Sequence, residues 1–304
     1  MIQYLKHNEI EKQKWDNCID HSVNNIIYSY SWYLDIVCPN WNALVEDDYK
    51  SVMPLTGNKK YGVHYLYPPY FAQQLGVFSK EKLSQKKVEE FLNSIPSDYK
   101  FMEVCLNTQN TFEFSGYKVK KNINLELSLN VAYGTLRKNY SRLTIRNIKK
   151  AIKNEVRLQK NVSLSNLITI FRKTRGKGIS NLKDKNYKVL LNLINTSVKK
   201  GYGEAWGAFT KENHLCAGII LLVKNNRAIF VFSATDIHAK ENGAMFFLID
   251  NFIRNNAGNN MIFDFEGSNL PGVARLYKGF GSKENVYLQV RKNNLPKIFR
   301  WLKG

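Results

Sequence analysis

Residues that can exchange protons follow two apolar segments in the C-terminal half of the chain. Asp236 and His238 come after the apolar run 228–234, and Glu266 comes directly after the apolar run 261–265. Burial at the end of a strand disfavours the charged form of a carboxylate, so we expect the pKa of Glu266 to be raised towards neutral. Glu266 is therefore the first candidate for a general base, and Asp236 or His238 could be the base or bind the acceptor. In the structural alternative, Glu266 only accepts backbone N–H bonds from the next helix.

Both apolar runs have the length of a buried strand, and each is followed by signals of a helix. After the first run, a polar loop at 235–242 precedes a helix at 243–256, whose apolar residues recur at helical spacing. After the second run, Pro271 stands where the first turn of a helix begins. Free N–H groups at helix N-termini favour an anion. We therefore expect the segments near residues 235 and 266 to open onto one cleft that receives a negatively charged acyl carrier.

The composition is typical of a folded protein with a large excess of positive charge. At 304 residues and 44% hydrophobic content, the chain can form one large or two medium domains with cores of their own. Lys and Arg number 45 against 25 Asp and Glu, which gives a net charge of +20. Such a charge attracts nucleic acid, anionic membrane or polyanionic small molecules, although an AT-rich genome also favours Lys codons.

Residues 131–160, which we expect to form one long amphipathic helix, carry basic side chains along one side. Its apolar residues cluster on one side, and its basic residues lie opposite with Glu155 as the only acid. A charged helix face is normally just solvated, but a single sign throughout favours contact with a polyanion such as tRNA. The basic residues with this predicted role are Arg142, Arg146, Lys149, Lys150, Lys153 and Arg157.

Cysteine and hydropathy patterns indicate no metal centre, disulfide framework or membrane span. The four cysteines are far apart, without a C-x-x-C pair or a nearby pair of histidines, so we predict no metal site. His64 and His214 are interpreted as turn residues. No apolar run reaches about 18 residues, and the N-terminus lacks the apolar core of a signal peptide. We therefore expect a cytoplasmic protein.

An aromatic segment in the N-terminal half surrounds Pro68 and Pro69, and this prolyl pair excludes a central strand. The segment is predicted to be a stiff loop that walls a substrate pocket, with amide groups nearby for binding. The alternative is an aromatic hairpin packed on the core. The candidate substrate-binding residues are Trp32, Tyr33, Tyr70, Gln73 and Gln74, together with Ser268 from the C-terminal half.

The two halves of the chain have similar element orders. Each contains two helices, a hairpin or meander, a helix, a strand, a short link and an alternating strand. This order predicts an α/β (α+β) protein built from two copies of one fold, residues 1–130 and residues 131–304. The polar loops at strand ends are kept mainly in the second copy, so we expect the chemistry there or between the copies.

The segment from Ala274 to Gly281 reads ARLYKGFG and resembles the GNAT acyltransferase superfamily. The doubled arrangement, the basic segment and the run Asp264-Phe265-Glu266-Gly267 are more similar to the Fem branch. That branch transfers aminoacyl groups from tRNA onto peptidoglycan precursors and includes acyl-CoA-dependent enzymes. The resemblance implies two tandem GNAT-like domains, each a mixed, mostly antiparallel sheet flanked by helices, of which the first is degenerate.

The resemblance also implies a reaction. It implies an N-acyltransferase that moves an acyl or aminoacyl group from acetyl-CoA, another acyl-CoA or aminoacyl-tRNA to a small-molecule or cell-envelope amine. Direct attack in a ternary complex is expected, because no G-x-S-x-G nucleophile motif is present. Tyr277 matches the GNAT tyrosine that protonates the leaving thiolate. The alternative is a non-catalytic RNA-binding or scaffold protein on a degenerate acyltransferase fold.

Two departures from the GNAT pattern concern the acyl donor. The diphosphate-binding pattern Gln/Arg-x-x-Gly-x-Gly/Ala is replaced by residues 240–245, which keep one glycine and end in Met245. Asn269 stands one residue further from Tyr277 than is usual. The predicted donor-binding residues are Phe232, Ser233, Ala234, Thr235, His238, Lys240, Asn242, Gly243, Ala244, Asn269 and Arg275.

Overall fold

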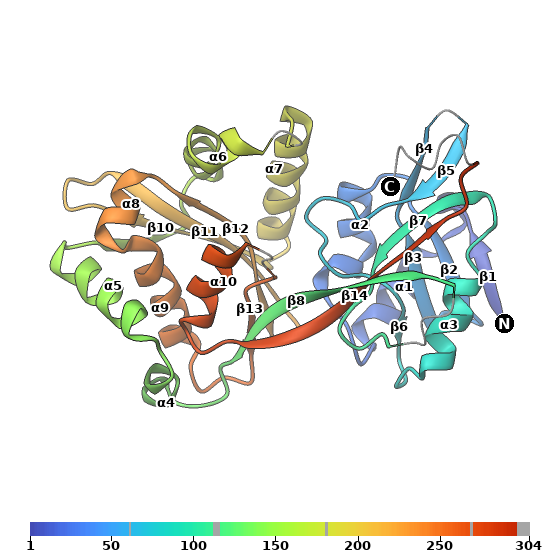
Figure 1. Ribbon diagram of the computed structural model, residues 1–304, viewed down its shortest axis with the longest axis horizontal. Helices are drawn as coiled ribbons and strands as arrows, with labels where there is room; N and C mark the ends of the chain where they lie inside the picture. Colours follow the sequence, from blue (N-terminus) through green and yellow to red (C-terminus); the bar gives the residue numbers. More distant parts are fainter. Residues whose placement is uncertain (61, 112–115, 180–181, 268–269, 297–304) are drawn as a thin grey trace. The chain divides into compact units, whose positions relative to one another are not determined.

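The computed structural model describes residues 1–60, 62–111, 116–179, 182–267 and 270–296 (Figure 1). The chain divides into two compact units. The first unit contains residues 1–122 together with the C-terminal residues from 286, and the second contains residues 123–285. The first unit thus takes in residues from both ends of the chain, whereas a boundary near residue 130 divides the chain only once.

The first unit contains a four-stranded antiparallel sheet and a second ladder. The sheet has the order β1 (Ile2–Leu5), β2 (Asn42–Glu46), β3 (Ser51–Leu55) and β6 (Phe78–Ser79). The ladder runs β4 (Gly57–Lys60), β5 (Val63–Leu66), β7 (Tyr99–Cys105) and the C-terminal strand β14 (Lys283–Asn293), with β5 parallel to β7. The α-helices of this unit are α1 (Lys12–Asp20), α2 (Ser31–Val37) and α3 (Gln85–Asn93).

The sheet of the second unit is mixed and mostly antiparallel. Its order is β8 (Lys118–Ser128), β13 (Ile262–Asp264), β12 (Arg227–Thr235), β11 (Leu215–Lys224), β10 (Gly203–Phe209) and β9 (Arg157–Lys160). Only β12 and β13 pair in parallel within this series. The strands β10 to β12 are rich in buried apolar residues on both faces, as expected for strands with helices on each side.

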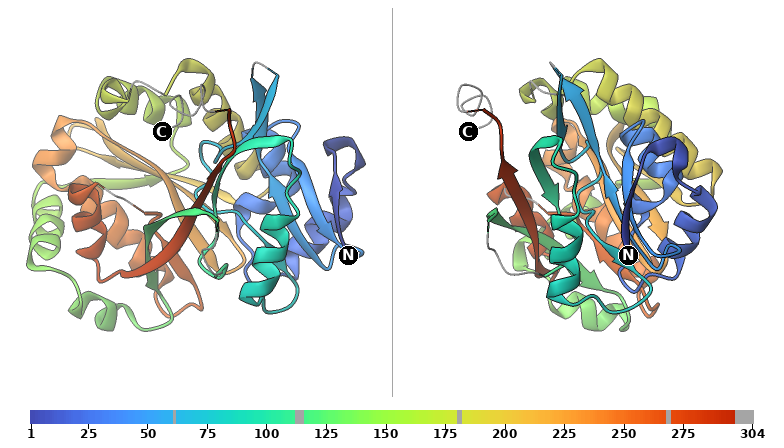
Figure 2. Two further views of the ribbon diagram at one scale, coloured as in Figure 1. Left: turned by 45° about the vertical axis from the view of Figure 1, so that its right-hand side comes forward. Right: turned by 90° about the vertical axis from the view of Figure 1, so that its right-hand side faces the viewer.

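Helices cover both faces of this sheet (Figure 2). On one face, α5 (Arg142–Lys153), α9 (Ala244–Asn256) and α10 (Pro271–Lys278) enclose a core that includes Trp206, Phe230, Phe252, Phe263 and Phe280. On the other face, α6 (Leu164–Lys173) packs on β11 and β12, and α7 (Asp184–Lys199) packs on β10. Two short helices, α4 (Tyr133–Lys138) and α8 (Ile237–Asn242), complete the unit. Within the described ranges, no helix combines the length and hydropathy that crossing a bilayer requires.

The prediction of one long helix over residues 131–160 is wrong. The helix α4 ends at Lys138, and a second helix, α5, begins at Arg142. The Ser141 side chain caps α5 by accepting the Thr144 N–H at 3.1 Å. Glu155 has a φ of 52°, which ends α5, and residues 157–160 form the edge strand β9. Arg157 therefore lies on a strand and not on the basic helix.

Two other predicted elements differ from the structure or fall outside it. The polar segment 235–242, predicted as a loop, contains the helix α8, because Asp236 caps it by accepting the Ala239 N–H. A closing helix over 295–302 lies mostly outside the described residues. The other strong signals, including the β10–β12 meander and the helices α6, α7, α9 and α10, are confirmed within a few residues.

Candidate functional site

The two parallel strands β12 and β13 diverge after a short paired stretch. They pair only through Arg227 with Ile262, Ala228 with Phe263 and Ile229 with Asp264. β12 then continues to Thr235, and its pairing with β11 skips one residue between Phe230 and Phe232. A bulge of this kind turns the strand away from its neighbour. Beyond Ile229, no described strand pairs with β12 on the β13 side, so this backbone edge is not used in a ladder.

Tyr277 on α10 packs against an aromatic residue from each of the two diverging segments. Its ring stacks on Phe265, which follows β13, at a centroid distance of 4.8 Å, and meets Phe230 of β12 edge-on at 5.7 Å. Only 7% of this residue is exposed. Burial, and to a lesser extent the negative charge of Glu266, raise the pKa of Tyr277, while Arg175 acts in the opposite direction. The phenol is therefore protonated at neutral pH and lies within electrostatic reach of one carboxylate and one guanidinium.

Glu266 is held in a strained turn directly after β13. Its φ is 56°, a left-handed conformation that non-glycine residues rarely adopt and that is often found at functional sites. Its N–H donates to Asp264 Oδ1 at 2.9 Å, and its carbonyl oxygen accepts the Leu125 N–H at 3.4 Å. This turn ends the regular alternation of the strand. The sequence allowed Asp264 and Glu266 to share one face, and the structure instead gives them different surroundings.

Asp264 belongs to a buried ionic network that supports the turn. Its Oδ2 lies 2.6 Å from Arg227 Nη1, and the same nitrogen lies 2.7 Å from Glu126 Oε1. Asn124 donates to Glu126 from β8 at 3.0 Å. Burial raises the pKa of Asp264, and the charge of Arg227 opposes this effect. Because its oxygens are bonded to Arg227 and to the Glu266 N–H, Asp264 positions Glu266 and is not itself poised as a base.

The predicted diphosphate seat at the start of α9 is closed. Gly243 has a φ of 79°, and a Cβ placed on it would lie 2.4 Å from the carbonyl oxygen of Asn147 on α5. The Ala244 N–H donates to Asn242 Oδ1 at 2.9 Å, and both Gly243 and Ala244 are buried. The N-terminus of α9 is thus covered by α5 and α8. The residues present do not fit the diphosphate of CoA at this position.

Asp236 lies in a different neighbourhood from Glu266. Its Oδ1 accepts the Ala239 N–H at 2.9 Å, and its Oδ2 lies 2.7 Å from His214 Nε2. Ile229 pairs with Asp264, so Asp236 is seven residues beyond that pair and Glu266 only two. The difference of five residues corresponds to roughly 16 Å along the strand direction. Asp236 therefore groups with His214 and His238, and not with Tyr277.

The remaining predicted donor residues are spread along β12, α8 and α10. Phe232 is buried and packs on the Phe171 ring of α6 at 4.8 Å, and Ala234 is also buried. Ser233 and Thr235 are half-buried, whereas Lys240 and Arg275 are exposed. Ser268 and Asn269 lie outside the described residues.

The predicted substrate-binding residues of the first unit are mixed in character. Tyr33 is fully buried and its hydroxyl donates to the Phe71 carbonyl oxygen. Gln74 is also buried, accepts the Thr108 N–H at 3.1 Å and donates to Gln73 Oε1 at 2.8 Å. These contacts give Tyr33 and Gln74 a role in the fold of this unit. Trp32 is half-buried and Tyr70 is exposed, and contact of either with a substrate stays a prediction.

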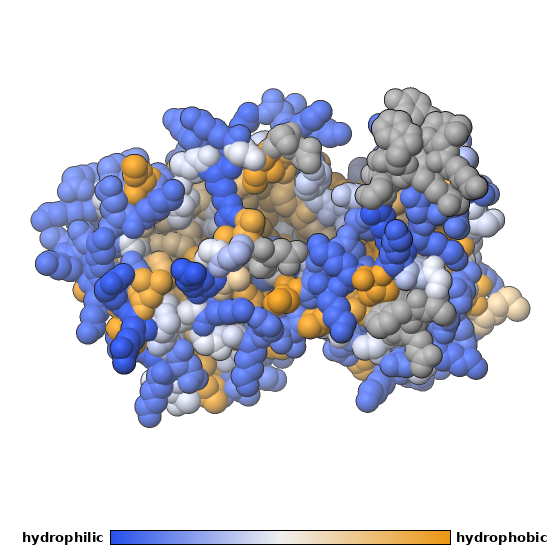
Figure 3. Space-filling view, viewed as in Figure 1, coloured by the Kyte–Doolittle hydropathy of each residue, from blue (hydrophilic) through white to orange (hydrophobic). Residues whose placement is uncertain are grey.

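The basic residues of α5 face the solvent. No ion pair joins them to an acidic residue in the part of the chain that the structure describes. Figure 3 shows hydrophilic side chains over the region of α5 and α8, and a hollow in the same face of this unit between α6 and α10. On the adjacent strand, Arg157 is exposed and donates to the Lys211 carbonyl oxygen at 3.4 Å. We name the exposed residues Arg142, Arg146, Lys149, Lys150 and Lys153 the basic face.

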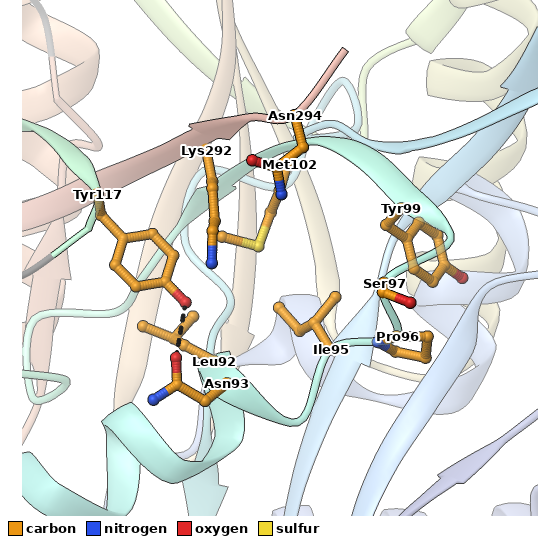
Figure 4. Close-up of a pocket in the computed structure, with 10 residues that line it drawn as sticks. All are labelled: Leu92, Asn93, Ile95, Pro96, Ser97, Tyr99, Met102, Tyr117, Lys292 and Asn294. Carbon is orange, nitrogen blue, oxygen red and sulfur yellow. Dashed lines mark hydrogen bonds between the residues drawn. The ribbon is translucent and has the colours of Figure 1, made fainter. Parts of the chain in front are cut away.

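Two cavities add to this picture. One of about 210 Å³ lies in the first unit, where the Lys292 side chain extends beside Tyr117, and Tyr117 donates to Asn93 Oδ1 at 3.2 Å (Figure 4). Its apolar wall includes Leu92 and Met102, and the residues drawn include no carboxylate and no histidine. The other cavity, of about 370 Å³, lies in the second unit beside α8 and includes His238 in its wall.

Comparison with known proteins identifies the fold. No model of a known protein family matches the sequence, and no curated protein matches it. Among solved structures, FemX matches with a TM-score of 0.69 at 10% identity, covering 99% of this chain and 100% of its own. L-PGS from Bacillus licheniformis matches at 0.55 and 9% identity, covering 95% and 93%. A tandem GNAT protein from the clavulanic acid biosynthesis pathway, solved without AcCoA, matches at 0.53 and 9%, covering 98% and 100%.

These matches show that the chain has a tandem GNAT fold of the Fem-like kind, which confirms the predicted fold class. They extend along almost the whole chain. At about one residue identical in ten, they concern the fold alone, so the chemistry must be argued from this chain's own side chains.

Sequence reasoning missed three residues of the second unit. Arg175 lies in the short helix η3 (Arg175–Gly178) after α6, and no local pattern connects it with Tyr277. Arg227 was assigned no role in the site. His214 could have been found, because a hairpin that pairs Ala217 with Thr235 brings residue 214 alongside residue 238.

Proposed function

We propose that this protein is an N-acyltransferase that uses Tyr277 and Glu266 to move an aminoacyl group from a polyanionic carrier to an amine. The observation that carries the proposal is the buried phenol of Tyr277, which packs on Phe230 and Phe265 where two parallel strands of a tandem GNAT fold diverge and lies within electrostatic reach of Glu266. Transfer to an amine requires one group that donates a proton and one that accepts a proton in the same site.

The proposed reaction is direct attack on an ester carbonyl. The amine nitrogen forms a bond to the carbonyl carbon, and Glu266 takes the proton that the nitrogen loses. The bond from the carbonyl carbon to the leaving oxygen breaks, and the Tyr277 hydroxyl gives its proton to that oxygen. Transfer of the proton from Glu266 to the tyrosinate restores both groups. Neither side chain becomes acylated, which agrees with the absence of a G-x-S-x-G motif.

Other groups around Tyr277 would assist this reaction. On the β13 side, the backbone edge of β12 beyond Ile229 has no strand partner among the described residues, so N–H groups on that edge can polarise the carbonyl oxygen. Phe230 and Phe265 exclude water from one side of the phenol. Arg175 is exposed and within electrostatic reach of Tyr277, where a guanidinium can bind a carboxylate or phosphate of a substrate.

Two observations favour aminoacyl-tRNA over acyl-CoA as the donor. The helix terminus that would hold the CoA diphosphate is closed by Asn147 and Asn242. The neighbouring α5 presents the basic face, whose cations lack acidic partners among the described residues. The resemblance of the sequence to the Fem branch supports the same donor. Acyl-CoA remains the alternative donor, and the experiment has to distinguish it from aminoacyl-tRNA.

The test is a transfer assay with both donors. Purified protein is incubated with a mixture of amines and either ¹⁴C-labelled aminoacyl-tRNA or ¹⁴C-labelled acetyl-CoA, and labelled amide products are separated. We expect product from aminoacyl-tRNA, and a reduction of about 10²–10⁴-fold in Tyr277→Phe and in Glu266→Gln. A matched control is Tyr117→Phe, which removes a phenol from the cavity of the first unit.

The outcomes distinguish the alternatives. Product from acetyl-CoA alone would retain the reaction centre and reject the proposed donor. Product from neither donor, or full activity in both Tyr277→Phe and Glu266→Gln, would reject the reaction centre.

Non-catalytic RNA binding is a second candidate function, favoured by the basic face. The triple variant Arg146→Glu, Lys150→Glu and Lys153→Glu should abolish binding of labelled tRNA, and log K for the wild type should fall steeply with log salt. A control with the same change in net charge reverses Lys59, Lys82 and Lys86, which are exposed residues of the first unit. Specific tRNA binding without transfer to any amine would favour this function over the enzyme.

A further inference from the structure

Three metal-ligand side chains meet at the end of β12. His214, Asp236 and His238 each offer one ligand atom, and these atoms all lie within 4.8 Å of one another. The two imidazole rings have a centroid distance of 5.3 Å and an interplanar angle of 74°. We propose that these residues bind a divalent transition-metal ion, with Zn²⁺ as the best fit. The proposal concerns a different part of the second unit from Tyr277 and does not depend on the transferase function.

The fold brings these residues together through one hairpin. β11 and β12 pair so that Ala217 lies opposite Thr235, and the Asp236 N–H donates to the Cys216 carbonyl oxygen at 2.9 Å. His214 is the residue before β11, and His238 lies in the first turn of α8. Asp236 lies between them in the chain, directly before α8. The three side chains therefore come from two segments that the sheet holds in fixed register.

The Asp236 side chain and the His214 backbone are each held by an additional hydrogen bond. Asp236 Oδ1 is occupied by the Ala239 N–H at 2.9 Å, which orients Oδ2 towards His214. The turn before β11 fixes the His214 backbone, because the Thr210 N–H donates to the His214 carbonyl oxygen at 2.8 Å. A second partner that orients a ligand is typical of metal sites in proteins.

The distances suit a small ion with nitrogen and oxygen ligands. Zn²⁺ binds these atoms at about 2.0–2.2 Å in a tetrahedral arrangement, which places the ligand atoms roughly 3.4 Å apart. His214 Nε2 and Asp236 Oδ2 are 2.7 Å apart, and no pair in the cluster exceeds 4.8 Å. Changes of about 0.7–1.4 Å in these separations reach the spacing of roughly 3.4 Å, and both imidazoles are exposed. Mg²⁺ and Ca²⁺ fit less well, because they prefer a shell of oxygen atoms.

The proposed ion would have an open coordination position. Zinc sites with three protein ligands keep a fourth position for water or another ligand. His238 lies in the wall of the cavity of about 370 Å³, which also contains Glu212 and Glu241. These carboxylates favour a cation. Lys153 and Lys211 line the same cavity, and Lys211 is already paired with a glutamate at 2.9 Å.

The experiment is Zn²⁺ titration of the full-length, tag-free protein after removal of metals with EDTA, followed by calorimetry. We expect one equivalent to bind to the wild type. His214→Ala and His238→Ala should each weaken binding by about 100-fold or more, since changes to partners of metal ligands alone cost about 10–100-fold. Asp236→Asn should also weaken it, although asparagine caps helices as well as aspartate. His21→Ala is the control, because His21 is an exposed residue of the first unit whose Nδ1 is bonded to the Asn17 carbonyl oxygen.

Two results would overturn the proposal. One is a wild type that binds no Zn²⁺ at a concentration of about 1 mM. The other is unchanged affinity in all three ligand variants, which would place the ion elsewhere, for instance on a cysteine. If an alanine variant fails to fold, Asp236→Asn still decides the question, because it keeps the cap and loses the charged ligand.

Discussion

The Arg227→Met variant removes the cation that pairs with both Asp264 and Glu126. Arg227 Nη1 lies 2.6 Å from Asp264 Oδ2, and the Asp264 side chain is only 1% exposed. Loss of one partner leaves a buried charge uncompensated, which costs about 3–5 kcal/mol. For a unit of this size each kcal/mol corresponds to about 2–4 °C, so the Tm of the second unit should fall by roughly 6–20 °C. Thermal unfolding followed by circular dichroism measures the change.

Arg172→Met provides a matched control for this measurement. Arg172 also lies 2.6 Å from a carboxylate, Asp184, but the two side chains are 51% and 76% exposed. Solvent screens such a pair, so Arg172→Met should lower the free energy of unfolding by about 1 kcal/mol. This value includes the loss of the contact between Arg172 and the Tyr187 ring. Equal losses in the two variants would refute the argument that burial makes the Arg227 pair important.

The raised pKa of Asp264 predicts how the loss of stability in Arg227→Met depends on pH. Without Arg227, burial raises the pKa of Asp264 further above its value in the unfolded chain. A carboxyl group whose pKa is higher in the folded chain than in the unfolded chain does not reduce stability below the unfolded pKa of about 3.9. The free energy of unfolding falls as the pH rises from that value through the folded pKa. The difference between wild type and Arg227→Met should therefore be smaller at pH 4.5 than at pH 7.5. The double variant Arg227→Met, Asp264→Asn should regain part of the stability at neutral pH, and the absence of any gain would contradict this reasoning.

Two further predictions concern packing. Gly243→Ala should lower the free energy of unfolding in urea by about 2–4 kcal/mol, because the new Cβ meets the Asn147 carbonyl oxygen at 2.4 Å. The control Gly258→Ala has a similar φ but open space around the new Cβ, so it should lower the free energy of unfolding by only about 1–2 kcal/mol. Equal losses in the two variants would contradict this prediction. Burial raises the pKa of all four thiols, that of Cys105 to about 12. At pH 8 a disulfide reagent should therefore label the native chain far more slowly than the urea-unfolded chain, and rapid native labelling would contradict the raised thiol pKa values.

Secondary structure could be predicted where one strong signal extends over the whole element. The β10–β12 meander combines apolar runs with Asn-rich turns, and α9 repeats apolar residues at helical spacing, so both were found. The helix predicted over 131–160 failed because its apolar periodicity continues through a real break. Tyr140 fits the periodic pattern but is buried in the connection, edge-on to Phe280 at 5.1 Å. The cap at Ser141 was the local signal that marks this break.

The site could be predicted only in part, since its decisive features are tertiary. Glu266 and Tyr277 were named from the sequence, and the structure places them within electrostatic reach of each other. Nothing local in the sequence shows that Asp264 is bonded to Arg227, a residue 37 positions away. In the same way, the closure of Gly243 depends on the Asn147 carbonyl oxygen of another helix. Contacts between residues distant in the sequence therefore determine whether a motif can bind a ligand.

The bonds of Asp236 decide which carboxylate can be the base. One of its oxygens accepts the Ala239 N–H and the other lies 2.7 Å from His214 Nε2, so both oxygens already have a partner within the protein. Glu266, by contrast, lies near the one buried phenol that the resemblance assigns to proton transfer. The two candidates named from the sequence therefore separate into different roles. Asp236 is bonded within the end of β12 beside His214, and in the proposed reaction the transfer of a proton from the amine is assigned to Glu266. Asp236→Asn should accordingly leave the transfer rate within about threefold of wild type, whereas Glu266→Gln should reduce it by about 10² or more.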